Sequence, residues 1–135
     1  MIKAVTMILI IGAAVGAQQI KKVPIQSTSA ASGREMFAAY CAVCHGTAGK
    51  GDGPVAKALK NRPVDLTTLS RNNGGTFPQV RVMGYINGEE TEAAHGTRDM
   101  PIWGELFRSL DANSRELSDL RVHNLAEYVK ALQAK

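Results

Sequence analysis

Large aromatic side chains are scarce in this sequence. Its 135 residues include three Phe, three Tyr and one Trp, which is few for a domain that must exclude water from its centre. With 44% hydrophobic residues the chain can still bury one modest core, and its length favours a single domain. A bulky apolar cofactor would add core volume that the side chains do not provide.

Patterns that would point to other classes of protein are also absent. No segment alternates apolar and polar residues as a half-buried strand would, and there is no internal repeat, so the predicted fold class is all-α. The sequence has no evident pair of catalytic carboxylates and no evident nucleophile–base arrangement, so it does not predict an enzyme. Without Lys3 the formal net charge falls from +4 to about +3, and no basic stripe is interleaved with aromatics. The sequence therefore does not predict nucleic-acid binding.

The N-terminus lacks an apolar run long enough to span a bilayer, which takes roughly 20 residues. Lys3 is a basic start, residues 4–16 are uncharged and mostly apolar, and Val15-Gly16-Ala17 supplies small residues at the cleavage positions. Residues 1–17 are therefore predicted to be a secretory signal peptide, with an uncleaved membrane anchor as the alternative. We expect a periplasmic or otherwise exported protein whose mature chain has no membrane span.

The segment that follows has no apolar period of either two or 3.6 residues. Residues 18–31 contain Lys21, Lys22, Pro24 and a Ser/Thr/Ala stretch. They are predicted to be a flexible tether, and residues 32–135 to be the folded domain.

The first predicted helix of the domain begins at Ser32. Ser32 and Glu35 are spaced as a capping box, in which each side chain binds the backbone N–H of the other residue. Helical spacing then places Cys41 and Cys44 on one face. The helix is therefore expected to present two thiols together.

Three further helices are predicted, over residues 54–60, 77–87 and 114–133. Asp52 is the expected cap of the helix over 54–60. Thr76 and Gln79 are the expected capping box of the helix over 77–87, and Gly88 is expected to end that helix. The last and longest helix has an apolar side. That side consists of Leu117, Leu120, Leu125, Tyr128, Val129 and Leu132.

The chemically specific motif is Cys41-Ala42-Val43-Cys44-His45. Two thiols at this spacing can add to the two vinyl groups of one haem, and the adjacent His can then bind its iron. A zinc site would need four ligands, and only His95 and His123 could complete it. A thioredoxin-like pair should follow a strand, and a simple disulfide leaves His45 unexplained. The motif therefore predicts one covalently bound haem c, with His45 as an iron ligand.

From about Ser32 to Leu132 the sequence resembles the small monohaem (class I) cytochrome c family. Gly33 and Phe37 on the first helix, with Leu125 and Tyr128 on the last, look like the crossing of terminal helices in that family. The resemblance implies about four helices packed around one haem, with the N- and C-terminal helices crossing. Without the resemblance, these four residues would be ordinary core residues of amphipathic helices.

The segment Asp99-Met100-Pro101-Ile102-Trp103-Gly104 is similar to the family's loop that supplies a methionine ligand. The resemblance implies that Met100 is the second axial ligand, which would raise the reduction potential relative to two histidines. His95 is the alternative ligand. Met36 and Met83 are expected to fill core gaps, and His123 to be exposed.

The resemblance also suggests three further residues near the haem. After Gly51-Asp52-Gly53, the carbonyl of Pro54 would accept the free N–H of His45, although an ordinary turn also explains this segment. Trp103 and Arg62 could reach the haem propionates. Packing alone would explain Trp103 equally well, and solvation alone would explain Arg62.

Motif and resemblance together predict an exported electron carrier, not an enzyme, that exchanges single electrons with redox partner proteins. The chain is expected to be a monomer unless it belongs to a complex. One alternative is a haem-based sensor of small ligands with an open coordination site; another is an electron-entry subunit of a larger oxidoreductase. Basic residues after the haem motif could form a rim that steers an acidic partner. These are Lys50, Lys57, Lys60 and Arg62.

Overall fold

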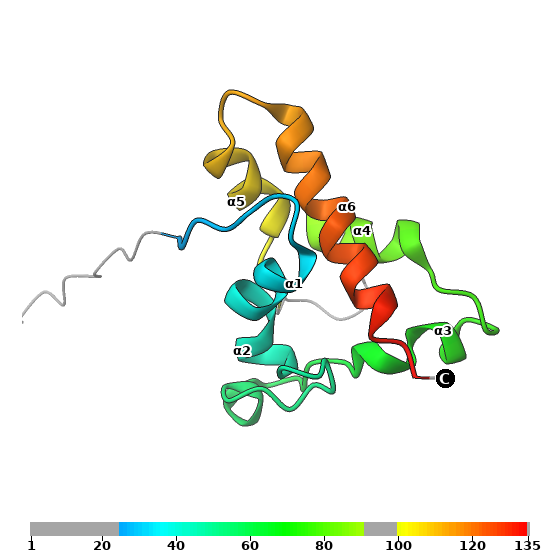
Figure 1. The fold of residues 1–135 in the computed structure, drawn as a ribbon. Helices are drawn as coiled ribbons and strands as arrows, with labels where there is room; N and C mark the ends of the chain where they lie inside the picture. The colour runs from blue at the N-terminus through cyan, green and yellow to red at the C-terminus, as the bar shows by residue number, and fades with distance from the viewer. Residues whose placement is uncertain (1–24, 91–99, 135) are drawn as a thin grey trace, which may run out of the picture.

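The computed structural model describes residues 25–90 and 100–134 (Figure 1). Within these ranges every regular element is helical, which confirms the all-α prediction. The α-helices are α1 (Gly33–Met36), α2 (Ala42–His45), α3 (Leu69–Asn72), α4 (Gln79–Asn87), α5 (Trp103–Leu110) and α6 (Arg115–Ala131). A π-helical turn, η1 (Phe37–Cys41), and two 3₁₀ turns, η2 (Ala56–Ala58) and η3 (Leu66–Thr68), complete the set.

The first helical segment runs without interruption from α1 through η1 into α2. Ser32 caps it as predicted, since its hydroxyl accepts the backbone N–H of Glu35 at 3.2 Å. The reciprocal bond of the capping box does not form, because the N–H of Ser32 already donates to the Ser29 carbonyl. The carboxylate of Glu35 accepts the N–H of Ser29 instead, at 3.3 Å. The cap therefore also holds the chain that enters the helix.

Helix α6 crosses α1 at the point predicted from the sequence (Figure 1). A Cβ added at Gly33 would overlap the carbonyl oxygen of Asn124 and lie 2.9 Å from Tyr128 Cβ, so the two backbones touch there. The rings of Phe37 and Tyr128 pack beside this contact with centroids 5.2 Å apart, and Leu125 is fully buried. Helix α6 also contacts α4 and α5, so the core lies between α6 and the other helices.

The buried side of α6 differs from the predicted one at its N-terminal half. Ser114, where the predicted helix begins, is its N-cap, but Leu117 and Leu120 are 43% and 41% exposed. Arg121 faces inward in their place because Asp111, at the end of α5, pairs with its guanidinium at 2.6 Å. The ion pair joins α6 to the residue that follows α5, and the buried side of α6 is partly polar there. The buried residues are Ser118, Arg121, Val122, Leu125, Ala126 and Val129.

Two of the shorter helices also differ from prediction. The helix expected over 54–60 is reduced to η2, without a cap from Asp52, because the N–H groups of Gly53 and Val55 bond back to α2 carbonyls. Helix α4 starts at Gln79 and not at 77, because Pro78 is its N-cap and the residue before a proline is disfavoured in a helix. The Gln79 side chain bonds to Glu127 and forms no capping box. Gly88 ends α4 with φ +78°, as predicted.

Helix α5 was not predicted. Its N-cap residue, Ile102, makes no side-chain capping bond, so the usual signal for a helix start is missing. The spacing of Trp103, Leu106, Phe107 and Leu110 does carry a helical period that could have indicated it.

Residues 25–31, here called the strap, pack against the helices although they contain no regular structure. Thr28 is buried, Ile25 packs against the core, and the Ala30 carbonyl accepts a bond from the side chain of Asn124 at 2.9 Å. This part of the predicted tether is therefore held on the domain. Residues 1–17, predicted to be a signal peptide, lie outside the described ranges. Among the described residues, none of the helices has the length and apolarity to cross a membrane.

Candidate functional site

Cys41 and Cys44 lie on the first helical segment, and both are free thiols. The Cys41 side chain is buried, whereas that of Cys44 is half-buried. Burial, with the neighbouring Cys44 as a smaller cause, raises the pKa of the Cys41 thiol to about 12. Both sulfurs are thus available for covalent attachment of one group, and Cys41 is a neutral thiol at physiological pH.

His45 follows at the end of α2, and its imidazole is buried. Its Nδ1 lies 3.2 Å from the carbonyl oxygen of Val64. A carbonyl can only accept, so Nδ1 carries the proton and Nε2 keeps its lone pair for a metal. Burial lowers the pKa of His45, and the bond to Val64 offsets this only in part, so the imidazole is neutral. A neutral, oriented imidazole is the form that binds iron.

The carbonyl that orients His45 was expected from Pro54 and comes instead from Val64. Pro54 is exposed at the start of the loop that folds back on α2. The Val64 segment reaches the histidine because Gly51 has no side chain: a Cβ there would overlap the Pro63 carbonyl oxygen. Two residues of the sequence could have indicated this approach: Pro63, the second proline after the cysteine motif, and Gly51, which adopts φ +75° in the structure.

Met100 is half-buried, packs against the edge of the core, and lies three residues before α5. Its alternative, His95, lies outside the described residues, as does Asp99. Met36 is fully buried and Met83 partly so, which agrees with their predicted role as core residues. His123 is exposed, as expected.

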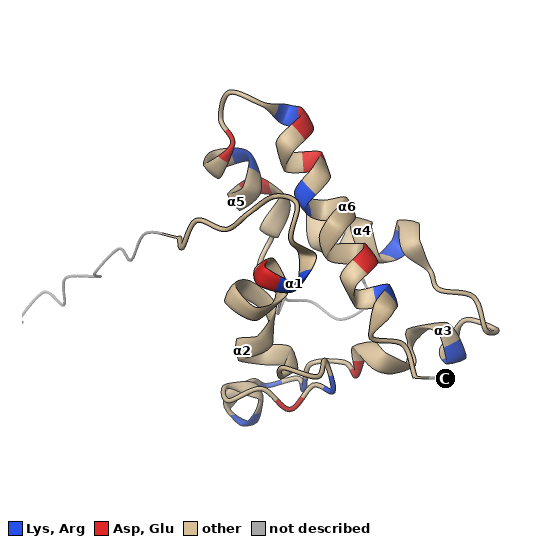
Figure 2. Ribbon diagram, viewed as in Figure 1, with Lys and Arg blue, Asp and Glu red and all other residues tan. Residues whose placement is uncertain are grey.

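Trp103, at the start of α5, stacks on Tyr40 with ring centroids 5.2 Å apart and an interplanar angle of 28°. Trp103 therefore packs against another aromatic ring, as one of its two predicted roles requires. Arg62 is exposed in the loop before Pro63. The other three residues of the basic rim, defined above, are exposed as well. Figure 2 shows these basic positions along the segment that follows α2.

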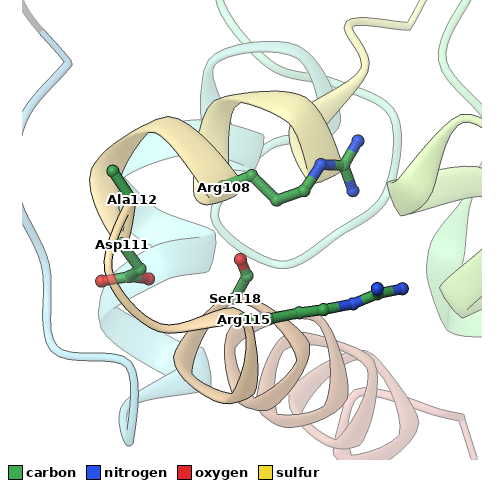
Figure 3. A pocket seen from close by; sticks show the side chains of 5 residues that line it. All are labelled: Arg108, Asp111, Ala112, Arg115 and Ser118. Carbon is green, nitrogen blue, oxygen red and sulfur yellow. The ribbon is translucent and has the colours of Figure 1, made fainter.

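Neither metal-ligand clusters nor the depression at the α5–α6 turn offer an alternative to this site in the part of the chain that the structure describes. Within residues 25–90 and 100–134, no three His, Cys, Asp or Glu side chains gather as metal ligands. An open depression of about 400 Å³ lies at the α5–α6 turn (Figure 3), and its lining includes none of the predicted site residues. It is lined by Arg108, Asp111, Ala112, Arg115 and Ser118. The chemistry-bearing side chains are thus those of the Cys41–His45 segment.

The donor set in that segment fits a haem c. Two free thiols on one helical segment could form its thioether bonds, and the uncommitted Nε2 of His45 could bind its iron. Met100 would supply a thioether from a different part of the chain. Two thiols separated by two residues and followed directly by a histidine are the arrangement of c-type haem attachment.

Comparison with known proteins gives the same assignment. The family model described as Cytochrome c matches residues 30–133, from the strap through the end of α6. No curated protein and no solved structure gives a significant match. The matched region covers most of the sequence and includes both cysteines, His45 and Met100. Together with the helix crossing and the thiol pair beside an oriented histidine, this match establishes that the chain belongs to the cytochrome c family.

Proposed function

We propose that this chain is an exported carrier of single electrons, with one haem c attached through Cys41 and Cys44 and with His45 and Met100 as its axial ligands. Family membership implies covalently bound haem c and electron transfer. The export, the attachment residues and the axial pair are the specific content of the proposal.

The observation that carries the proposal is the state of His45. Its imidazole is buried next to two free thiols, and its Nδ1–H is bonded to the Val64 carbonyl. Such a bond fixes the orientation of a metal-binding histidine and increases its basicity. An imidazole with no functional partner would have little reason to be buried and aligned in this way.

When bound, the haem supplies the one-electron chemistry of its iron. The thiols of Cys41 and Cys44 would hold the group, and His45 and Met100 would be the ligands that the chain offers to its iron. A thioether from Met100 opposite an imidazole favours the ferrous state, which suits a carrier that works at a raised potential.

Partner recognition is assigned to the exposed surface near the attachment segment. The four residues of the basic rim are exposed in the loop after α2, where Asp52 is also exposed. Four cations in one loop would attract an acidic redox partner and accelerate encounter. Export through residues 1–17 would place the carrier in the compartment where its partners lie, as a monomer.

Acid–acetone extraction of the purified protein tests the attachment. Thioether bonds survive denaturation, so the haem should stay on the polypeptide at one per chain. Haem that moves into the acetone would contradict the proposal. The double variant Cys41→Ser with Cys44→Ser should accumulate little folded protein, because loss of the haem exposes the apolar surface that surrounds it. A stable, compact double variant would contradict the proposed attachment equally well.

A further inference from the structure

Tyr40 connects the attachment segment to the helix that follows Met100. It directly precedes Cys41, and its ring stacks on Trp103 and packs against Phe107, with centroids 5.2 and 5.7 Å away. Both partners belong to α5, whose first residue is Trp103. The start of α5 is therefore held against the attachment segment by aromatic packing.

The hydroxyl of Tyr40 is bound to the strap. It donates to the Gln26 carbonyl, and its oxygen lies 2.9 Å from Thr28 Oγ1. Because the single proton of Tyr40 is used on Gln26, Thr28 must donate in the second bond. The strap thus fixes the ring that supports α5.

Arg121 of α6 joins the strap to the other end of α5. Arg121 is 5% exposed, and its guanidinium donates to the Thr28 carbonyl at 2.8 Å and to Thr28 Oγ1 at 3.2 Å. The same group donates twice to the Asp111 carboxylate, at 2.6 and 3.3 Å. Asp111 is the residue that ends α5.

The pairing of Asp111 with Arg121 is selective. Arg108 and Arg115 lie close in sequence to the same turn, yet in Figure 3 their side chains extend away from the Asp111 carboxylate. Among the described contacts of Asp111, the charged partner is the buried Arg121. The result is a closed series of contacts, here called the strap network, that holds α5 at both ends. It consists of Thr28, Tyr40, Trp103, Asp111 and Arg121.

We propose that the strap network positions Met100. The inference rests on the proposed function, in which Met100 binds the iron. Met100 is three residues from Trp103 and is itself only half-buried, so its position depends on where α5 begins. Thr28, Tyr40, Asp111 and Arg121 are therefore positioning residues for the sixth ligand. Loosening the strap makes Met100 leave more readily and admits external ligands to the iron.

Titration of the ferric holoprotein with imidazole tests this role. Loss of the long-wavelength sulfur-to-iron band reports the displacement of Met100. Tyr40→Phe keeps the stacked ring and removes only the two hydroxyl bonds to the strap. Thr28→Val removes the bonds of Oγ1 at nearly constant volume. Each variant should bind imidazole about three- to tenfold more tightly than the unmodified protein, the range expected when hydrogen bonds that hold one state are lost. Ser109→Ala is the matched control, because it removes a hydroxyl of α5 that bonds only within the helix.

A second background separates positioning from general loosening. In Met100→Ala no ligand has to be displaced, so adding Tyr40→Phe should leave imidazole affinity unchanged. The inference would be overturned if Tyr40→Phe raised imidazole affinity equally with and without Met100→Ala. It would also be overturned if Tyr40→Phe did not raise the affinity of the protein that retains Met100. A protein that lacks the sulfur-to-iron band before any substitution would instead contradict the proposed function, and with it the role given to the network.

Discussion

Nδ1 of His45 lies 3.2 Å from the carbonyl oxygen of Val64, a residue 19 positions further along the chain. The bond closes the loop after α2 over the attachment segment and fixes the tautomer of the imidazole. The partner is a backbone group, so no side-chain substitution at Val64 removes it. Its contribution has to be tested through the residue that lets the Val64 segment approach, which is Gly51.

Gly51→Ala should displace the Val64 segment from His45. The added Cβ would overlap the Pro63 carbonyl oxygen, and the φ of +75° disfavours any side chain. Weakening the bond to Nδ1 lowers the basicity of the imidazole, so the reduction potential should rise. Potentiometric titration measures this. Gly74→Ala is the control, since Gly74 also has a positive φ but has nothing within 4 Å. An equal shift in both variants would show that backbone strain alone is responsible.

Gly33→Val should destabilise the helix crossing. Its side chain meets the Asn124 backbone, which cannot rotate away, and overpacking of this kind typically costs about 1–3 kcal/mol. Thermal unfolding of the holoprotein should show a clearly lower midpoint. Ala38→Val, at an exposed position of the same helical segment, should change it little. Identical midpoints for the two variants would mean that the crossing does not depend on close backbone contact.

The helix crossing and several helix ends could be predicted from the sequence, because their signals are local. Ser32 caps the first helical segment as expected, and the predicted helix from Ser114 begins there with Ser114 as N-cap. Gly88 ends α4, and Gly33 faces α6. Each signal depends on residue type and on spacing within a few positions. The two cysteines and His45 form an equally local motif.

The contacts that differ from prediction depend on residues far apart in the chain. The apolar side predicted for α6 does not include Arg121, whose burial depends on Asp111 at the end of α5 and on Thr28, 93 positions away. The partner of His45 is a backbone carbonyl, which leaves no trace in side-chain chemistry. Pro54 was chosen by resemblance to the family, and the approach of the Val64 segment depends on how the whole loop folds.

Arg121→Met should be strongly destabilising. It leaves the Asp111 carboxylate, 10% exposed, without its partner, and losing one member of a buried pair typically costs about 3–5 kcal/mol. Urea unfolding measures the loss. The double variant Arg121→Met with Asp111→Leu should recover part of it, since no unpaired charge remains. Lys130→Met removes an exposed ion pair with Glu127 and should change stability by less than about 1 kcal/mol. A single variant as stable as that control would exclude the buried pair as a structural element.

The basic rim should govern reactions with charged oxidants. Oxidation of the ferrous protein by hexacyanoferrate(III), an anion, should slow as ionic strength rises, because salt screens the attraction. Reversing one charge of the rim, with Lys57→Glu or with Lys60→Glu, should lower the rate at low salt. Arg115→Glu, at the α5–α6 turn, makes the same change in charge away from the rim and should have a smaller effect. Equal effects at both places would remove the steering role of the rim.

The absorption spectrum of the ferric protein at long wavelength tests the central assignment most directly. The weak sulfur-to-iron charge-transfer band should be present, and Met100→Ala should abolish it, lower the potential and let carbon monoxide bind to the ferrous form. His95→Ala should do none of these. If the unmodified protein lacks the band and its ferrous form binds carbon monoxide readily, Met100 is not a stable ligand, and a sensor with an open coordination site replaces the electron carrier.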